Sequence, residues 1–216
     1  MFLADRAESV RNGRLMSAAA SIPLPQEAVP HIAGLTCLRE LAFYGVQATD
    51  EDVHQLRRLW RLETVRLTGP GITDQALADL ATMKRLERID LYESSIAGLG
   101  LRHLMALPRL QRLVLESESI DDEVLAPLGK MRQLQELGLF CTPITDEGMK
   151  RLAGLTQLRK LWLAETKVGD EGLRCLAGMT ALEELSLDGT AVTDAGLEHL
   201  KGLTKLKALS LYGVRI

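Results

Sequence analysis

The residues that could act as nucleophiles, acids or metal ligands are few and lie far apart in this chain. Its three cysteines form no CxxC pair and show no Cys/His spacing typical of a zinc site. Cys141 has no Lys, Arg or His beside it in the sequence that would lower its pKa. No Ser/His/Asp or Cys/His set is placed to converge, and the histidines are His31, His54, His103 and His199. We therefore expect no catalytic residue, no metal site, no cofactor and no enzymatic activity.

One carboxylate does recur at a regular place in the chain. The members of this series are Asp50, Asp74, Asp122, Asp146, Asp170 and Asp194. Apolar residues three apart follow each of them, as Leu197 and Leu200 do, and this step predicts a short helix. A carboxylate at the start of a helix accepts hydrogen bonds from the free N–H groups of the first turn. Because each Asp precedes a different helix, the series predicts capping and not a shared metal site.

These helices belong to a repeat of 24 residues that runs through most of the chain. Apolar residues also recur at places four, seven and nine of each unit, and places seven and nine have the period of a strand. Each unit is therefore predicted to hold one strand and one short helix. The units open at Leu35, Leu59, Met83, Leu107, Met131, Leu155, Met179 and Leu203.

The repeat resembles those of the leucine-rich-repeat family, with the sequence pattern LxxLxLxxTxITDxGLxxLxxL. Residues 137–149 and 185–197 come closest to it, and Thr142, Thr166 and Thr190 stand where a hydroxyl can bond the backbone of the turn after the strand. Similar repeats occur in F-box leucine-rich proteins and in bacterial repeat proteins. The resemblance implies an α/β fold, a right-handed horseshoe-shaped solenoid with a concave parallel β-sheet and short helices on its convex side.

The two ends of the chain differ from the repeats between them. Residues 1–34 are expected to form a tail and a degenerate capping repeat, because apolar residues fall in register at Leu24, Val29 and Ile32. Residues 35–216 hold eight repeats, the last of which stops after its strand. We expect either that the natural chain was longer or that this edge pairs with another subunit.

Composition narrows the classes of partner. The formal net charge of −3 and the pI near 5.9 leave no excess of Lys and Arg, so we expect no nucleic acid partner. No apolar run approaches the roughly 18 residues that cross a bilayer, and the first residues do not match a secretory signal. We expect no membrane association and a cytoplasmic location.

The concave face is where a partner is expected to bind. Places six, eight and ten of each strand must point there, since places seven and nine face the core. Of the eight aromatic residues, five occupy places eight and ten, namely Tyr44, Tyr92, Phe140, Trp162 and Tyr212, where random placement would put fewer than one. Phe140 and Trp162 are predicted to touch diagonally, with Gly138 leaving a notch beside them. Trp60, at the turn before its strand, is predicted to pack and not to bind.

Aromatic anchors within a charged rim are the usual composition of a protein interaction site. The predicted binding residues are Arg66, Arg88, Asp90, Tyr92, Arg112, Val114, Glu116, Phe140 and Trp162. Their mixed charges favour a protein or peptide partner over a polyanion. A simpler explanation is that aromatic residues suit a pleated surface and pair across strands.

Two other functions stay open on the sequence. Residues 24–32 resemble the opening LPxE of an F-box, and with the ITDxGL wording they suggest the substrate-recognition arm of a ubiquitin-ligase-like complex or a bacterial effector. The uncovered last repeat instead suggests a structural spacer or a fragment of a larger repeat protein.

Overall fold

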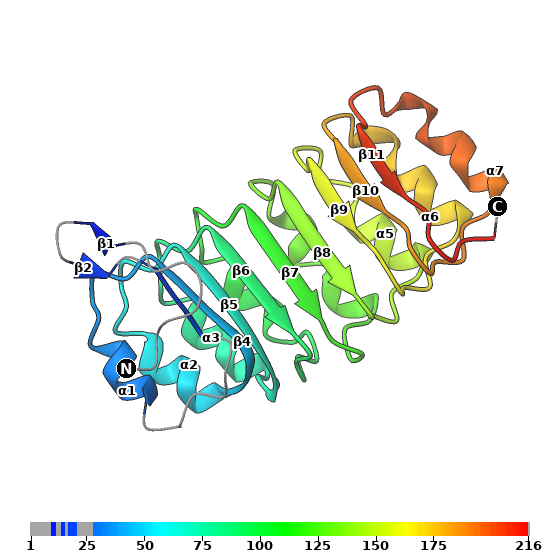
Figure 1. The fold of residues 1–216 in the computed structure, drawn as a ribbon. Helices are drawn as coiled ribbons and strands as arrows, with labels where there is room; N and C mark the ends of the chain where they lie inside the picture. The colour runs from blue at the N-terminus through cyan, green and yellow to red at the C-terminus, as the bar shows by residue number, and fades with distance from the viewer. Residues whose placement is uncertain (1–9, 12–13, 16, 21–27, 216) are drawn as a thin grey trace.

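The computed structural model describes residues 10–11, 14–15, 17–20 and 28–215 of the chain. Its main feature is one sheet whose nine strands lie in the order of the sequence, from β3 at one end to β11 at the other (Figure 1). Neighbouring strands in this sheet are parallel. The strands are β3 (Ser17–Ala20), β4 (Glu40–Thr49), β5 (Thr64–Gly71), β6 (Arg88–Tyr92), β7 (Arg112–Glu116), β8 (Glu136–Phe140), β9 (Lys160–Trp162), β10 (Glu184–Ser186) and β11 (Ala208–Ser210).

The described helices are short and lie behind the sheet, so they leave its other face open (Figure 1). The α-helices are α1 (Ala28–Ala33), α2 (Asp50–Leu56), α3 (Asp74–Leu80), α4 (Leu101–Leu104), α5 (Asp146–Leu152), α6 (Asp170–Arg174) and α7 (Asp194–Leu197). Short 3-10 helices are η1 (Glu123–Leu125), η2 (Leu128–Lys130), η3 (Cys175–Gly178) and η4 (Glu198–Gly202). A small antiparallel pair, β1 (Val10–Arg11) and β2 (Arg14–Leu15), precedes the sheet. The predicted fold class, a solenoid of parallel strands alternating with short helices, is confirmed.

The register of the sheet follows the repeat. Leu137 lies opposite Leu161, and Leu185 lies opposite Leu209, a step of one unit in each case. Side chains at the same place of neighbouring units therefore stack into rows across the strands. Leu137 and Leu161 are fully buried against the helices, like the apolar residues at the same place in most other units. The core is thus a set of apolar rows between sheet and helices, and each unit buries its apolar side against its neighbours.

The Asp series links neighbouring repeats, and the prediction that each Asp caps its own helix is wrong. The N-cap of α3 is Thr73, whose hydroxyl accepts from the backbone N–H of Gln75. Asp50, one repeat earlier, accepts from the Thr73 backbone N–H at 2.8 Å and from its hydroxyl at 2.6 Å. Asp122 holds Thr145 in the same way. The carboxylate therefore links the starts of two consecutive helices, and we call this pair of hydrogen bonds the inter-repeat clasp.

The turns after the strands show a second repeated bond. The hydroxyls of Thr142, Thr166 and Thr190 donate to the carbonyl three residues earlier at 3.3, 2.7 and 2.6 Å. All three threonines are buried, as expected for a bond that closes each turn. This prediction is confirmed.

Less of the expected N-terminal part can be compared with the structure. Val29 and Ile32 on α1 are buried, whereas Leu24 and the rest of the LPxE segment lie outside the described residues. Strand β3 adds to the sheet beside β4, with Ser17 opposite Glu40. The described strand β3 and helix α1 thus cover the first full repeat.

Candidate functional site

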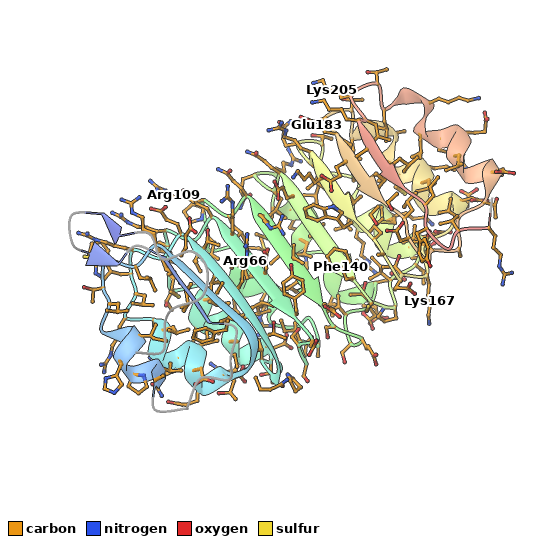
Figure 2. All side chains as sticks on the ribbon, viewed as in Figure 1. Arg66, Arg109, Phe140, Lys167, Glu183 and Lys205 are labelled. Carbon is orange, nitrogen blue, oxygen red and sulfur yellow. The ribbon has the colours of Figure 1, made fainter. Side chains whose placement is uncertain are left out.

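The open sheet face is formed by the side chains that alternate with the core leucines. On β8, Leu137 and Leu139 are fully buried, whereas Glu136 and Phe140 are partly exposed. Phe140 lies near the middle of this face (Figure 2). A partner that approaches the open face therefore meets Phe140 and its neighbours on β6, β7 and β9.

Phe140 and Trp162 form a stacked aromatic pair on this face. Their ring centroids are 6.4 Å apart and the ring planes differ by 21°. The residue directly opposite Trp162 on β8 is Gly138, so the pair is diagonal, as the sequence predicted. Both rings are partly exposed and offer one continuous apolar surface.

The notch expected at Gly138 is filled by its neighbours. A Cβ atom at this position would lie 2.9 Å from Cε2 of Phe140 and 3.2 Å from both γ carbons of Val114. Glycine is therefore what allows the Phe140 ring to lie down on the sheet. Val114, predicted to touch a partner, is fully buried beneath the surface. It supports the site without being accessible.

Asp90, predicted as a rim charge, is instead a buried acid between two arginines. Its side chain is 1% exposed, and it accepts from Nε of Arg66 at 3.0 Å and from Nε of Arg112 at 2.8 Å. Arg112 also donates from Nη1 to Glu136 at 2.6 Å. A buried carboxylate is stable only when it is paired and hydrogen-bonded, and Asp90 meets both conditions. It therefore fixes the arginines and is not available to a partner.

Arg112 connects these charges to the aromatic pair. Burial disfavours its charged form, but hydrogen bonds to Asp90 and Glu136 outweigh burial and raise the pKa of Arg112 above its ordinary value. Its Cζ lies 4.9 Å from the centroid of the Trp162 ring, a cation–π contact. Arg112 therefore remains charged and holds one face of the indole.

Two further residues, which the sequence analysis did not select, hold Trp162: Lys160 on its own strand β9 and Glu184 on β10. Nε1 of Trp162 donates to Glu184 at 2.8 Å, and Nζ of Lys160 lies 5.8 Å from the ring centroid. Lys160 also pairs with Glu184 and Glu136 at 3.6 and 3.7 Å. Residues 112, 136, 160 and 184 share place six and alternate in sign, a signal that was available in the sequence.

Tyr92 completes the group on the side of β6. Burial and the charge of Asp90 raise the pKa of its phenol, whereas a hydrogen bond with Arg112 acts in the opposite direction. The phenol is therefore neutral near pH 7 and remains a hydrogen-bond donor. We call the connected set Tyr92, Arg112, Phe140 and Trp162 the aromatic platform.

The other predicted residues lie around the aromatic platform or away from it. Glu116 is partly exposed on β7 opposite Phe140, and Arg88 is exposed on β6 opposite Arg112. Tyr212 follows β11 at the end of the described sheet and is 85% exposed, and it lies apart from the platform. The side chain of Tyr44 lies outside the described part of the chain.

Trp60 departs from its expected packing role. It is 51% exposed, and two guanidinium groups lie close to its ring, with Cζ of Arg61 at 4.5 Å and Cζ of Arg85 at 5.2 Å from the ring centroid. It therefore makes cation–π contacts at the surface and is not part of the core.

The described residues offer little for metal or thiolate chemistry. Within residues 10–11, 14–15, 17–20 and 28–215, no three His, Cys, Asp or Glu side chains come together as metal ligands. Burial and the charges of Glu116, Glu165 and Glu118 raise the pKa of the Cys141 thiol, which disfavours the reactive thiolate. In the same described part, no helix is long and apolar enough to span a bilayer.

Comparisons with known proteins agree with this architecture. The family model described as "Leucine Rich repeat" matches residues 130–153 and 155–177. A comparison with curated proteins found no match. An internalin (inlF) from Listeria monocytogenes is similar in structure, with a TM-score of 0.65, 24% identity and coverage of 88% of this chain and 51% of that one. An internalin C2 (inlC2) from the same organism is similar with a TM-score of 0.69 and 22% identity, and the match covers 91% of this chain and 80% of that one.

The chain thus spans about half the length of the inlF structure. At 24% and 22% sequence identity, these two structural similarities show the fold alone. The family match falls on two consecutive units of the solenoid, and the strands on either side continue with the same 24-residue register. Residues 130–153 and 155–177 thus match the leucine-rich-repeat family, and the described chain has the fold of a leucine-rich-repeat solenoid.

Proposed function

We propose that this protein is an interaction module that binds a protein or peptide partner on the open sheet face, with the aromatic platform as the centre of the interface. The observation that carries the proposal is the stacked pair Phe140–Trp162, which is partly exposed on a face that none of the described helices covers. Aromatic side chains and arginine dominate the central residues of protein interfaces.

The aromatic platform is preorganised for binding. Trp162 is held by Glu184, Lys160 and Arg112, and Phe140 rests on Gly138. Ordering a flexible side chain on binding costs about 0.5–1.5 kcal/mol, and side chains that are already fixed avoid this loss. A partner can therefore gain the burial of two rings with little ordering of this surface.

The charges around the aromatic platform favour a protein partner over a polyanion. Arg112 is shared between Asp90 and Glu136, and Lys160 between Glu136 and Glu184. Because these cations are already neutralised, a phosphate chain would gain little from them. A mixed, mostly apolar partner surface fits better, with its own polar groups meeting Arg88 and Glu116 at the margin.

Affinity capture from the native lysate tests the proposal. Wild type, the double variant Phe140→Ser/Trp162→Ser and the control Trp60→Ser/Tyr212→Ser are used as baits after circular dichroism shows that each is folded. The control removes two exposed aromatic residues elsewhere on the chain. We expect a partner that wild type and control retain and the platform variant loses. Equal capture by all three would place the function elsewhere, and capture by none would favour a structural spacer.

A further inference from the structure

A second surface with its own chemistry lies along the edge of the sheet where the strands begin. A groove of about 510 Å³ is lined by the turns that precede β7 to β11, from Pro108 to Lys205. We call it the edge groove. Figure 2 shows Arg109, Glu183 and Lys205 along this edge, whereas Lys167 lies at the opposite edge of the sheet. The edge groove is therefore separate from the aromatic platform, which occupies the middle of the open face.

The floor of the edge groove is a regular backbone ladder. The N–H of Gln135 donates to the carbonyl of Gln111 at 2.8 Å, and the N–H of Arg159 donates to that of Gln135 at 2.7 Å. The N–H of Glu183 then donates to Arg159 at 2.7 Å. The side chains at this place are thus presented at the strand spacing of about 4.8 Å. A row with fixed spacing suits a ligand that is itself linear and regular.

Glutamine amides give the edge groove both donors and acceptors. Gln111, Gln133, Gln135 and Gln157 line it, and Gln133 is held by a bond from its Nε2 to the carbonyl of Leu107 at 3.2 Å. Gln111 and Gln157 are exposed and Gln135 partly so. An amide that offers one N–H pair and one carbonyl is complementary to the N–H and C=O groups of an extended peptide. This lining favours recognition of a peptide backbone.

The edge groove is also basic, although the chain as a whole is acidic. Its charged lining residues are the cations Arg109, Arg132, Arg159 and Lys205 and the acid Glu183. Glu183 already pairs with Arg159 at 2.6 Å, and with Lys207 at 2.8 Å. Arg109, Arg132 and Lys205 are exposed. Because positive charge is in excess along the groove, a ligand that carries carboxylates would be attracted to it.

We propose that the edge groove binds an extended acidic peptide segment of a partner protein, with the glutamines bonded to its backbone and Arg109 and Arg132 to its carboxylates. Four strand intervals separate β7 from β11 and span roughly 19 Å, which about six residues of extended chain would cover. None of the described residues that line the groove is aromatic, so it offers no stacking surface for nucleic acid bases. A peptide therefore fits it better than a nucleic acid.

The test uses the full chain and a fluorescein-labelled peptide of eight alternating glutamate and serine residues, followed by fluorescence anisotropy. We expect saturable binding, and at least tenfold weaker binding for Arg109→Gln/Arg132→Gln. The matched control Arg102→Gln/Arg151→Gln makes the same charge change on exposed arginines of α4 and α5 and is expected to stay within twofold of wild type. Absence of saturable binding, or an equal loss in the control, would overturn the proposal.

Two further experiments test whether the groove recognises the peptide backbone or only the negative charge of the peptide. A backbone N-methylated peptide of the same charge, and the variant Gln111→Met/Gln135→Met, are each expected to weaken binding about tenfold. Unchanged binding in both arms, or equal competition by inorganic polyphosphate at the same charge concentration, would reduce the groove to a general attraction for anions and contradict the assignment. The platform variant Phe140→Ser/Trp162→Ser is expected to bind the peptide as wild type does, and a loss there would place the peptide on the open face instead.

Discussion

Asp90 lies almost fully buried under Arg112, whose Nε donates to its Oδ1 at 2.8 Å, and this bond ties the charged residues of the open sheet face to its aromatic pair. Arg112 in turn lies over Trp162. The geometry of the proposed interface thus depends on an acid that no partner can reach.

Replacing Asp90 should destabilise the fold and loosen the platform together. Asp90→Ala leaves Arg66 and Arg112 without their shared acceptor, and because both arginines are partly exposed we expect a loss of about 2–3 kcal/mol in the free energy of unfolding, below the value for fully buried pairs. Urea denaturation measures it, with the exposed acid variant Glu123→Ala as control. Equal stability of the two variants would show that Asp90 does not hold the network.

Adding one methyl group at Gly138 should displace the Phe140 ring. The new Cβ would lie 2.9 Å from that ring, so Gly138→Ala must move it off the sheet. We expect a change in the fluorescence of Trp162, measured in a Trp60→Phe background, and a loss of about 1 kcal/mol in stability. An unchanged spectrum would mean that the ring and the indole do not depend on this glycine.

The inter-repeat clasp should contribute measurably to stability. Asp122→Ala removes the acceptor of two bonds from Thr145, and we expect a loss of about 1–2 kcal/mol. Asp194→Ala is the control, because among the described residues its carboxylate accepts no such bond. Similar losses in both variants would point to helix propensity in place of the clasp.

One turn position should accept glycine with a gain in stability. Glu93 has a φ of 49°, in the left-handed region, where an L side chain costs about 1–2 kcal/mol and glycine does not. We expect Glu93→Gly to raise the stability by about 1 kcal/mol, which for a chain of this size is a shift of roughly 2–4 °C in Tm. Glu118→Gly, outside the left-handed region, should show no gain. A lower Tm for Glu93→Gly would contradict this.

The pH dependence of stability should carry a contribution from Asp188. Burial opposes its charged form, but bonds from the Ser210 hydroxyl, the Tyr212 N–H and the Ser186 hydroxyl outweigh burial and lower the pKa of this carboxyl below its ordinary value of 3.8. A lowered pKa gives stability that is present above pH 4 and lost as the pH falls through the folded-state value. We expect Asp188→Asn to flatten the acid limb of a Tm-against-pH curve. Curves that differ only by a constant offset would rule out this linkage.

The sequence was sufficient for the features that follow from the repeat itself. A fixed period of 24 residues places Leu137 against Leu161, and strand alternation brings Phe140 and Trp162 to one face. Both follow from spacing alone. The hydroxyl bonds of the turn, such as that of Thr166, follow from the position of the hydroxyl after the strand.

Other features depend on how side chains lie, which no period specifies. Val114 at place eight and Phe140 at place ten both point outward, yet Val114 is covered because the Phe140 ring folds toward it over Gly138. Asp90 is buried because long arginines from both neighbouring strands fold over it. The Asp carboxylates bond to the next repeat because the starts of consecutive helices lie side by side. This proximity between repeats cannot be inferred from one repeat viewed alone.

The central claim is that the aromatic platform is the binding surface. Titration calorimetry of the captured partner with wild type and with Phe140→Ser/Trp162→Ser tests it most directly. Loss of two central aromatic residues, each worth about 2 kcal/mol, should raise the Kd roughly a thousandfold, while Trp60→Ser/Tyr212→Ser leaves it unchanged. A Kd for the platform variant that equals that of wild type would contradict the account.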